Sequence, residues 1–148
     1  MKKSSFLALL LSLVLLATAS TPVGAATVND PYEIAPCYVH CDTSDIMFTV
    51  SNNQAIVKVL YEGIPTTFTQ AQVTVKIQKR FLGIFWSTVD IGLPDNEWVA
   101  YNNNVSGSFY NTFPVDGTGT YRAKITLEVF GLTGVSDVIE ETIECKYE

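Results

Sequence analysis

The sequence has few of the residues on which most enzymes depend. It contains one histidine, His40, and three cysteines among 148 residues, and charged residues make up only 16% of the chain. Glycine-rich phosphate loops and nucleophile motifs are missing, and a Ser-His-Asp or Cys-His site would have to be built on His40 alone. The sequence therefore predicts a protein that is not an enzyme, with no catalytic residues and no cofactor.

Metal-binding patterns are also missing. Cys37, His40, Cys41 and Cys145 could be drawn as a zinc site, but their spacing matches neither C-x₂-C nor H-x₃-H. The acidic residues of the second half form no loop with the regular spacing that calcium requires. We therefore expect no metal site.

The only long apolar run lies at the N-terminus. Met1-Lys2-Lys3 is basic, residues 6–17 are almost wholly apolar, and small residues follow up to Ala26. A membrane-spanning helix needs about 20 apolar residues, whereas this order is typical of a secretory signal. We predict that residues 1–25 are a signal peptide cleaved after Ala25, with Ala26 as the alternative last residue, and that the protein is secreted to the extracellular space.

Basic residues are scarce in the processed chain. Without Lys2 and Lys3, seven remain against fifteen acidic residues, a net charge near −8. Nucleic acids and anionic lipids are negatively charged and bind positively charged protein surfaces. An acidic protein therefore excludes nucleic acid as a partner and does not favour membrane contact. The remaining 123 residues suit one folded domain, and the sequence leaves its oligomeric state open.

Three cysteines in an exported chain predict one disulfide and one spare thiol. A bridge from the N-terminal segment to Cys145 would close a loop of about 100 residues, worth about 4–5 kcal/mol in the chain-entropy model. Cys41–Cys145 is the favoured pair, Cys37–Cys145 is the alternative, and a local Cys37–Cys41 bridge is the third option.

From Ile46 onward the apolar residues alternate with polar ones, which indicates strands. The clearest strand begins at Tyr121, where every second residue to Val129 is apolar, and residues 72–80 and 84–91 flank Gly83 as a hairpin. We predict an all-β fold, an immunoglobulin-like antiparallel two-sheet sandwich of about seven strands over residues 46–148. Residues 26–45 would form an N-terminal segment that carries Cys37 and Cys41.

The stretch Asp116 to Ala123 is similar to the tyrosine corner of immunoglobulin-like domains, in which the Tyr hydroxyl bonds back to nearby backbone. Tyr121 would be that residue. Ala123 stands where immunoglobulins place their second cysteine, so the usual bridge between the sheets is missing.

Two further motifs carry a family resemblance. The run Ile77-Gln78-Lys79 followed by Trp86, and then Gly119-Thr120-Tyr121-Arg122-Ala123-Lys124, resembles small secreted β-sandwich proteins of Gram-positive bacteria, mostly catalogued as domains of unknown function. The resemblance spans residues 46–144 and implies an exported sandwich. It brings no catalytic residues, and the segment with Cys37 and Cys41 lies outside it.

The most unusual surface candidate is the hairpin from Lys79 to Trp86, which places two cations beside a cluster of apolar residues. By default, Trp86 and alternate apolar side chains would pack into the core or cover a sheet edge. Because residues 82–86 are apolar on both faces, which one buried face does not require, a binding surface remains the competing interpretation. Its residues would be Lys79, Arg80, Phe81, Phe85 and Trp86.

A second cluster of aromatic residues surrounds residues 102–104 and could stack on a sugar; its members are Trp98, Tyr101, Phe109 and Tyr110. The sequence thus favours a non-enzymatic extracellular binding or cell-envelope-associated module. Its partner would be an extracellular protein, a glycan or an envelope component. The alternative is an antimicrobial or membrane-active protein that uses the Phe81–Trp86 hairpin, and a hydrolase or thiol enzyme is least favoured.

Overall fold

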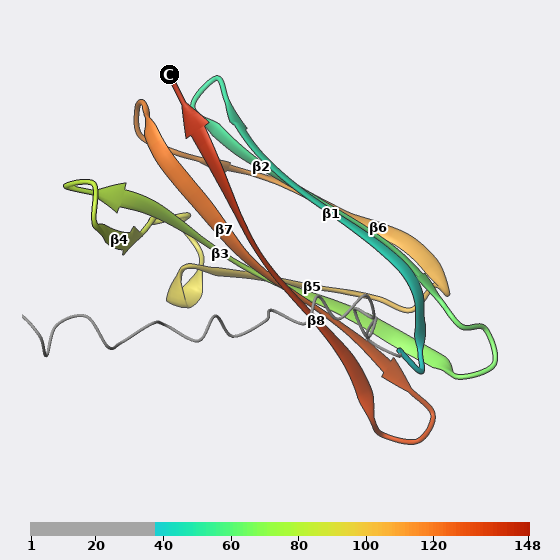
Figure 1. The fold of residues 1–148 in the computed structure, drawn as a ribbon. Coiled ribbons are helices and arrows are strands. Elements are labelled where there is room, and N and C mark those ends of the chain that lie inside the picture. The colour runs from blue at the N-terminus through green and yellow to red at the C-terminus, as the bar shows by residue number, and fades with distance from the viewer. Residues whose placement is uncertain (1–37) are drawn as a thin grey trace, which may run out of the picture. The chain divides into compact units, whose positions relative to one another are not determined.

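The computed structural model describes residues 38–148, which form eight β-strands in two packed antiparallel sheets (Figure 1). The first sheet has the order β1-β2-β6, with bounds Cys41–Ser51, Gln54–Gly63 and Ser106–Pro114. The second has five strands, β3 Phe68–Phe81, β4 Phe85–Thr88, β5 Glu97–Asn102, β7 Gly119–Gly131 and β8 Ser136–Tyr147. The all-β, two-sheet prediction is confirmed.

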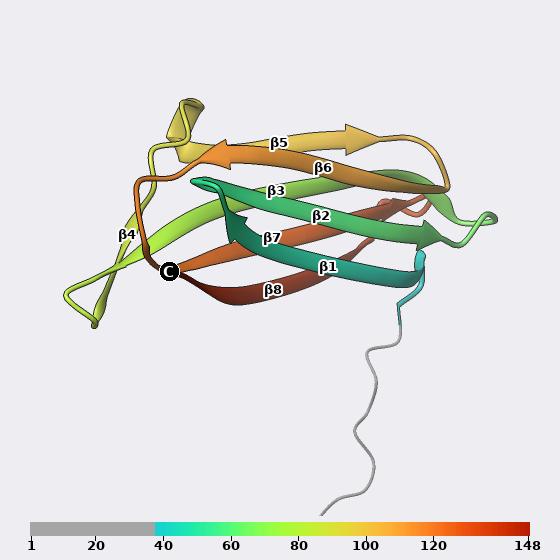
Figure 2. The ribbon, with the colours of Figure 1, turned by 90° about the horizontal axis from the view of Figure 1, so that it is seen from above.

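Strand β3 organises the second sheet. One of its edges pairs with β7, and the other pairs first with β5 and then, further along, with β4. Strand β8 pairs with the far side of β7. Figure 2 shows the long strands of both sheets lying along roughly one axis, with the β3–β4 hairpin at one end.

The core lies between the sheets and follows the alternation seen in the sequence. Val73, Val75 and Ile77 of β3 are fully buried, as is every second residue of β7 from Tyr121 to Val129. The first sheet contributes Val57 and Val59 from β2 and aromatic residues from β1 and β6. Because β-branched side chains fit a pleated, buried surface, these runs favour strands over helices.

Two predicted boundaries are wrong. The first strand begins at Cys41, five residues before Ile46, because the chain is already paired with Gly63 there. Strand β4 ends at Thr88 instead of Ile91; after the Val89 N–H donates to the Ile77 carbonyl at 2.9 Å, the chain leaves the sheet. The predicted signal peptide, its cleavage site and Cys37 lie outside the described residues.

Helical structure in this part of the chain is limited to one 3-10 turn at Pro94–Asn96. Residues 38–148 hold no helix with the length and apolarity needed to cross a membrane.

Candidate binding site

The β3–β4 hairpin projects beyond the neighbouring strands (Figures 1 and 2). Leu82 and Gly83 have positive φ values of 50° and 74°, which make the tight turn between the paired residues Phe81 and Phe85. Pairing of β3 with β7 ends at Lys79, so Phe81 lies past the end of its neighbour. The sequence pattern correctly predicted the hairpin.

Four large apolar side chains at this end of the hairpin are exposed, each by between 60% and 74% of its surface. We call them the hairpin tip: Phe81, Leu82, Ile84 and Phe85. The default interpretation, that the apolar residues of the hairpin pack into the core or cover a sheet edge, is therefore wrong for these four. Alternation places Phe81 on the same face as Ile77, but Phe81 is exposed and does not belong to the core between the sheets.

Trp86 lies on the opposite face of the hairpin, close to two guanidinium groups. The central carbon of Arg80 lies 4.6 Å from the centre of the Trp86 ring, and that of Arg122 lies 4.2 Å away. Arg80 also pairs with the Glu144 carboxylate at 3.0 Å, and Arg122 donates to Gln78 at 2.7 Å. Trp86 is thus half-buried by cations instead of by the core. The contact of Arg122 with Trp86 could not be predicted from the sequence, because Arg122 belongs to a strand 36 residues further along the chain.

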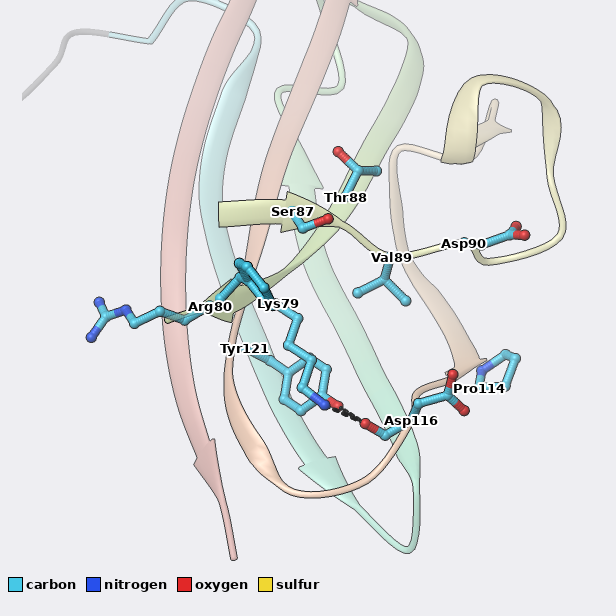
Figure 3. Close-up of a pocket in the computed structure, with 10 residues that line it drawn as sticks. Lys79, Arg80, Ser87, Thr88, Val89, Asp90, Pro114, Asp116 and Tyr121 are labelled. Carbon is cyan, nitrogen blue, oxygen red and sulfur yellow. Dashed lines mark hydrogen bonds between the residues drawn. The ribbon is translucent and has the colours of Figure 1, made fainter. Parts of the chain in front are cut away.

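A pocket of about 520 Å³ opens between the base of the hairpin and the loop before β7 (Figure 3). The Lys79 side chain runs along its floor, whereas Arg80 points away from it. Its lining mixes charged, hydroxyl and apolar side chains: Lys79, Arg80, Phe81, Ser87, Thr88, Val89, Asp90, Pro114, Asp116 and Tyr121. The volume is in the range of small-ligand sites, and Phe81 joins the pocket to the hairpin tip.

Three contacts hold Lys79 in place. Its ammonium group donates to the Asp116 carbonyl and lies 5.1 Å from the centre of the Tyr121 ring. Its stem packs on the backbone of Gly119, where a Cβ atom would lie 2.9 Å from the Lys79 Cε. The pocket therefore has a positioned cation on its floor, and the acidic residues Asp90 and Asp116 also line it.

Tyr121 forms the hydrogen bond expected of a tyrosine corner. Its buried hydroxyl lies 2.7 Å from the carbonyl oxygens of both Asp116 and Gly117, and its single proton is donated to one of them at a time. The Asp116 carbonyl thus accepts from Tyr121 and Lys79 together. This contact fixes the loop that closes the pocket.

Replacing Tyr121 with phenylalanine is expected to lower the free energy of unfolding by about 1–2 kcal/mol, because a buried hydrogen bond is lost while the ring still fills the core. Urea denaturation measures the change. Tyr147→Phe is the matched control, since the hydroxyl it removes contacts Asn53 at 3.2 Å in an exposed position. Its expected cost is below about 0.5 kcal/mol. Equal costs for the two variants would contradict a special role for the Tyr121 hydroxyl.

Asp137, at the beginning of β8, holds the beginning of β1 in place. Its carboxylate accepts backbone N–H groups from Val39 at 3.1 Å, His40 at 2.5 Å and Cys41 at 2.9 Å. Desolvation by burial works against ionisation of Asp137, but these three hydrogen bonds and the nearby His40 outweigh it and hold its pKa below the usual value. The sequence analysis missed Asp137, although it has the same inward register as Ile139.

His40 lies in the bend just before β1, and its side chain is buried. It is 1% exposed, and neither ring nitrogen has a hydrogen-bond partner among residues 38–148. The ring lies against the backbone of Gly131, where a Cβ atom would be 2.1 Å from the His40 Cε1. His40 does not line the pocket beside the hairpin, so the one histidine and the candidate binding site are separate features.

The predicted Cys41–Cys145 disulfide is wrong, and both cysteines within residues 38–148 are free. Cys41 is hydrogen-bonded to Asp137 at the beginning of β8, while Cys145 lies eight residues further along the same strand, roughly 25 Å away. A disulfide needs Cα atoms about 4.4–6.8 Å apart. The two alternative pairs involve Cys37, which lies outside the described residues.

Cys41 has none of the properties of a reactive thiol. It is 3% exposed, and burial together with the charges of Asp137 and Asp42 raises its pKa to about 11. Because the thiolate is the nucleophilic form, such a thiol is largely unreactive at neutral pH.

The aromatic residues around 102–104 do not form one surface. Phe109 is buried against Tyr61, and Trp98 packs edge-on against Phe113 with ring centres 5.7 Å apart. Tyr101 and Tyr110 are exposed, each by 61%. A stack of four rings for a sugar is therefore not present.

No protein-family model matches the chain, and no curated protein matches it either.

Proposed function

We propose that this protein is a secreted, non-enzymatic binding module on an immunoglobulin-like sandwich, and that it binds its partner through the hairpin tip. The observation that carries this proposal is the exposure of four large apolar side chains at one projecting end, beside a pocket. Exposed apolar side chains that adjoin one another mark interaction sites more often than scattered ones do. The partner would be an extracellular protein, a glycan or an envelope component.

Three observations support the immunoglobulin-like, exported character of the proposal. The chain has two packed antiparallel sheets, and the Tyr121 hydroxyl bonds back to the Asp116 and Gly117 carbonyls. Residues 1–25 have the composition of a secretory signal. The motifs around Lys79, Trp86 and Tyr121 resemble small exported proteins of Gram-positive bacteria.

The burial of the nucleophile and base candidates supports a binding role over an enzymatic one. His40 and Cys41 are adjacent in sequence, but each is at most 3% exposed, and the pKa of the Cys41 thiol is raised to about 11. The pocket beside the hairpin is lined by neither of them. A thiol or serine hydrolase would need its nucleophile and base to meet a substrate.

The proposal is tested by pelleting the processed chain, which begins at Ala26, with isolated cell envelopes of a Gram-positive bacterium. The double variant Phe81→Ser/Phe85→Ser is expected to bind about tenfold more weakly or worse, since two apolar side chains no longer leave water. Tyr101→Ser is the matched control, because Tyr101 is exposed to the same degree but lies on β5. Binding that is equal for the parent chain and the double variant would show that the hairpin tip is not the binding site.

A further inference from the structure

We infer that the partner of the hairpin tip is a phospholipid bilayer, with the tip inserted at the boundary between headgroups and acyl chains. This inference rests on the proposed function and names the occupant of the same site. The acidic composition of the chain argues against membrane contact. Composition is an average over the whole chain, however, and the end of the hairpin is apolar, exposed and flanked by basic residues.

The first argument is that the tip is apolar on more than one side. Phe81 and Phe85 form a cross-strand pair on the inner face, while Leu82 and Ile84 extend from the turn itself, and Trp86 lies on the outer face. A rigid protein surface would cover one of these sides and leave the others in water. A bilayer surrounds an inserted tip completely, so it removes all of the exposed apolar side chains from water together.

The second argument is the position of the cations. Arg80 and Lys79 lie one and two residues before Phe81, and Arg122 adjoins Arg80 across Trp86. Two residues of strand span about 7 Å, which matches the 5–10 Å depth of interfacial insertion. With the tip at that depth, the cations and the Trp86 ring would lie among the headgroups, where guanidinium groups bind phosphate and tryptophan is enriched.

The charge of the whole chain limits which lipids should matter. Zwitterionic and anionic lipids both carry a phosphate group. Lys79, Arg80 and Arg122 would therefore meet phosphate in either kind of lipid. Because the net charge of the processed chain is near −8, with seven basic against fifteen acidic residues, an anionic surface repels most of the molecule. We therefore expect phosphatidylcholine vesicles to bind the chain at least as well as vesicles with equal parts of phosphatidylglycerol.

Trp86 can report on insertion directly. The chain contains two tryptophans, so Trp98→Phe leaves Trp86 as the only one, and a melting curve checks that this variant is folded. Added to phosphatidylcholine vesicles, the processed chain with this change should show Trp86 emission at shorter wavelength, and lipids brominated near the headgroup should quench it. Phe85→Ser on this background should weaken partition into the vesicles about tenfold. Tyr110→Ser, an equally exposed site on β6, should leave partition unchanged.

An unshifted, unquenched Trp86 together with no vesicle binding would overturn the bilayer inference. If the hairpin variants still lose envelope binding in that case, the proposed function stands and the partner is a protein or a glycan. If sedimentation instead shows a dimer that Phe85→Ser dissociates, the occupant is a second copy of this chain, and the bilayer inference is wrong. If the hairpin variants bind envelopes like the parent chain, the proposed function falls as well.

Discussion

Replacing Gly131 with alanine is expected to lower the free energy of unfolding by about 3 kcal/mol, because the added methyl group would overlap a buried side chain. The new Cβ would lie between 2.1 and 2.4 Å from three ring atoms of His40. Gly131 is not among the residues with positive φ, so alanine fits the backbone and the cost is steric alone. Urea or thermal denaturation followed by circular dichroism measures it.

The His40 ring cannot move aside easily, because only 1% of it is exposed. The control is therefore the double variant His40→Ala/Gly131→Ala, in which the side chain that blocks the new methyl group is gone. His40→Ala alone removes buried ring surface, which costs stability. It also removes two ring nitrogens that have no hydrogen-bond partner among the described residues, which offsets part of that cost, so it should cost less than Gly131→Ala. The double variant should be more stable than Gly131→Ala by about 1–3 kcal/mol, and strictly additive effects would contradict the contact.

Local sequence patterns were sufficient to predict the strands and which face of each strand is buried. The alternation in residues 73–77 and 121–129 predicts which side chains are buried, because one face of each strand meets the other sheet. The turn at Gly83 predicted the hairpin, because turn geometry depends only on residues that are adjacent in the sequence. These features need no knowledge of distant contacts.

Contacts between distant parts of the chain could not be predicted in this way. Asp137 and Gly131 were visible as a charged residue and a glycine at inward positions, which indicates a special partner. That partner, the segment from Val39 to Cys41, lies more than 90 residues earlier in the sequence. The same limit produced the wrong disulfide, because the sequence placed Cys41 near the last strand without showing which end of that strand it meets.

The exposure of the hairpin tip depends on strand length in the other sheet. Phe81 continues the inward alternation of β3, so its pattern is that of a core residue. Whether it is covered depends on how far the first sheet extends, and this is a property of the packed sheets instead of the local sequence. The binding and core interpretations of residues 79–86 could therefore be separated only by the structure.

Replacing Asp137 with alanine is expected to lower the free energy of unfolding by about 3 kcal/mol, because three backbone N–H groups at the beginning of β1 lose their acceptor. Asp137→Asn should cost less, since its carbonyl oxygen can accept some of these hydrogen bonds. Asp42→Ala, which removes an exposed carboxylate from the same end of β1, is the matched control and should cost below about 0.5 kcal/mol. Denaturation by urea at neutral pH compares the three variants, and equal costs for Asp137→Ala and Asp42→Ala would contradict the role of Asp137.

The pH dependence of these variants tests the electrostatic part of the contact. The pKa of Asp137 is lower in the folded chain than in the unfolded chain, so its ionisation adds stability that is fully present above the unfolded value of about 4. That contribution is lost as the pH falls through the folded pKa, because the unfolded chain then binds the proton first. The stability difference between the parent chain and Asp137→Asn should consequently be constant from pH 7 to about pH 5 and shrink below about pH 4. A difference that stays constant down to pH 2 would show that the hydrogen bonds at Val39, His40 and Cys41 do not depend on a charged carboxylate.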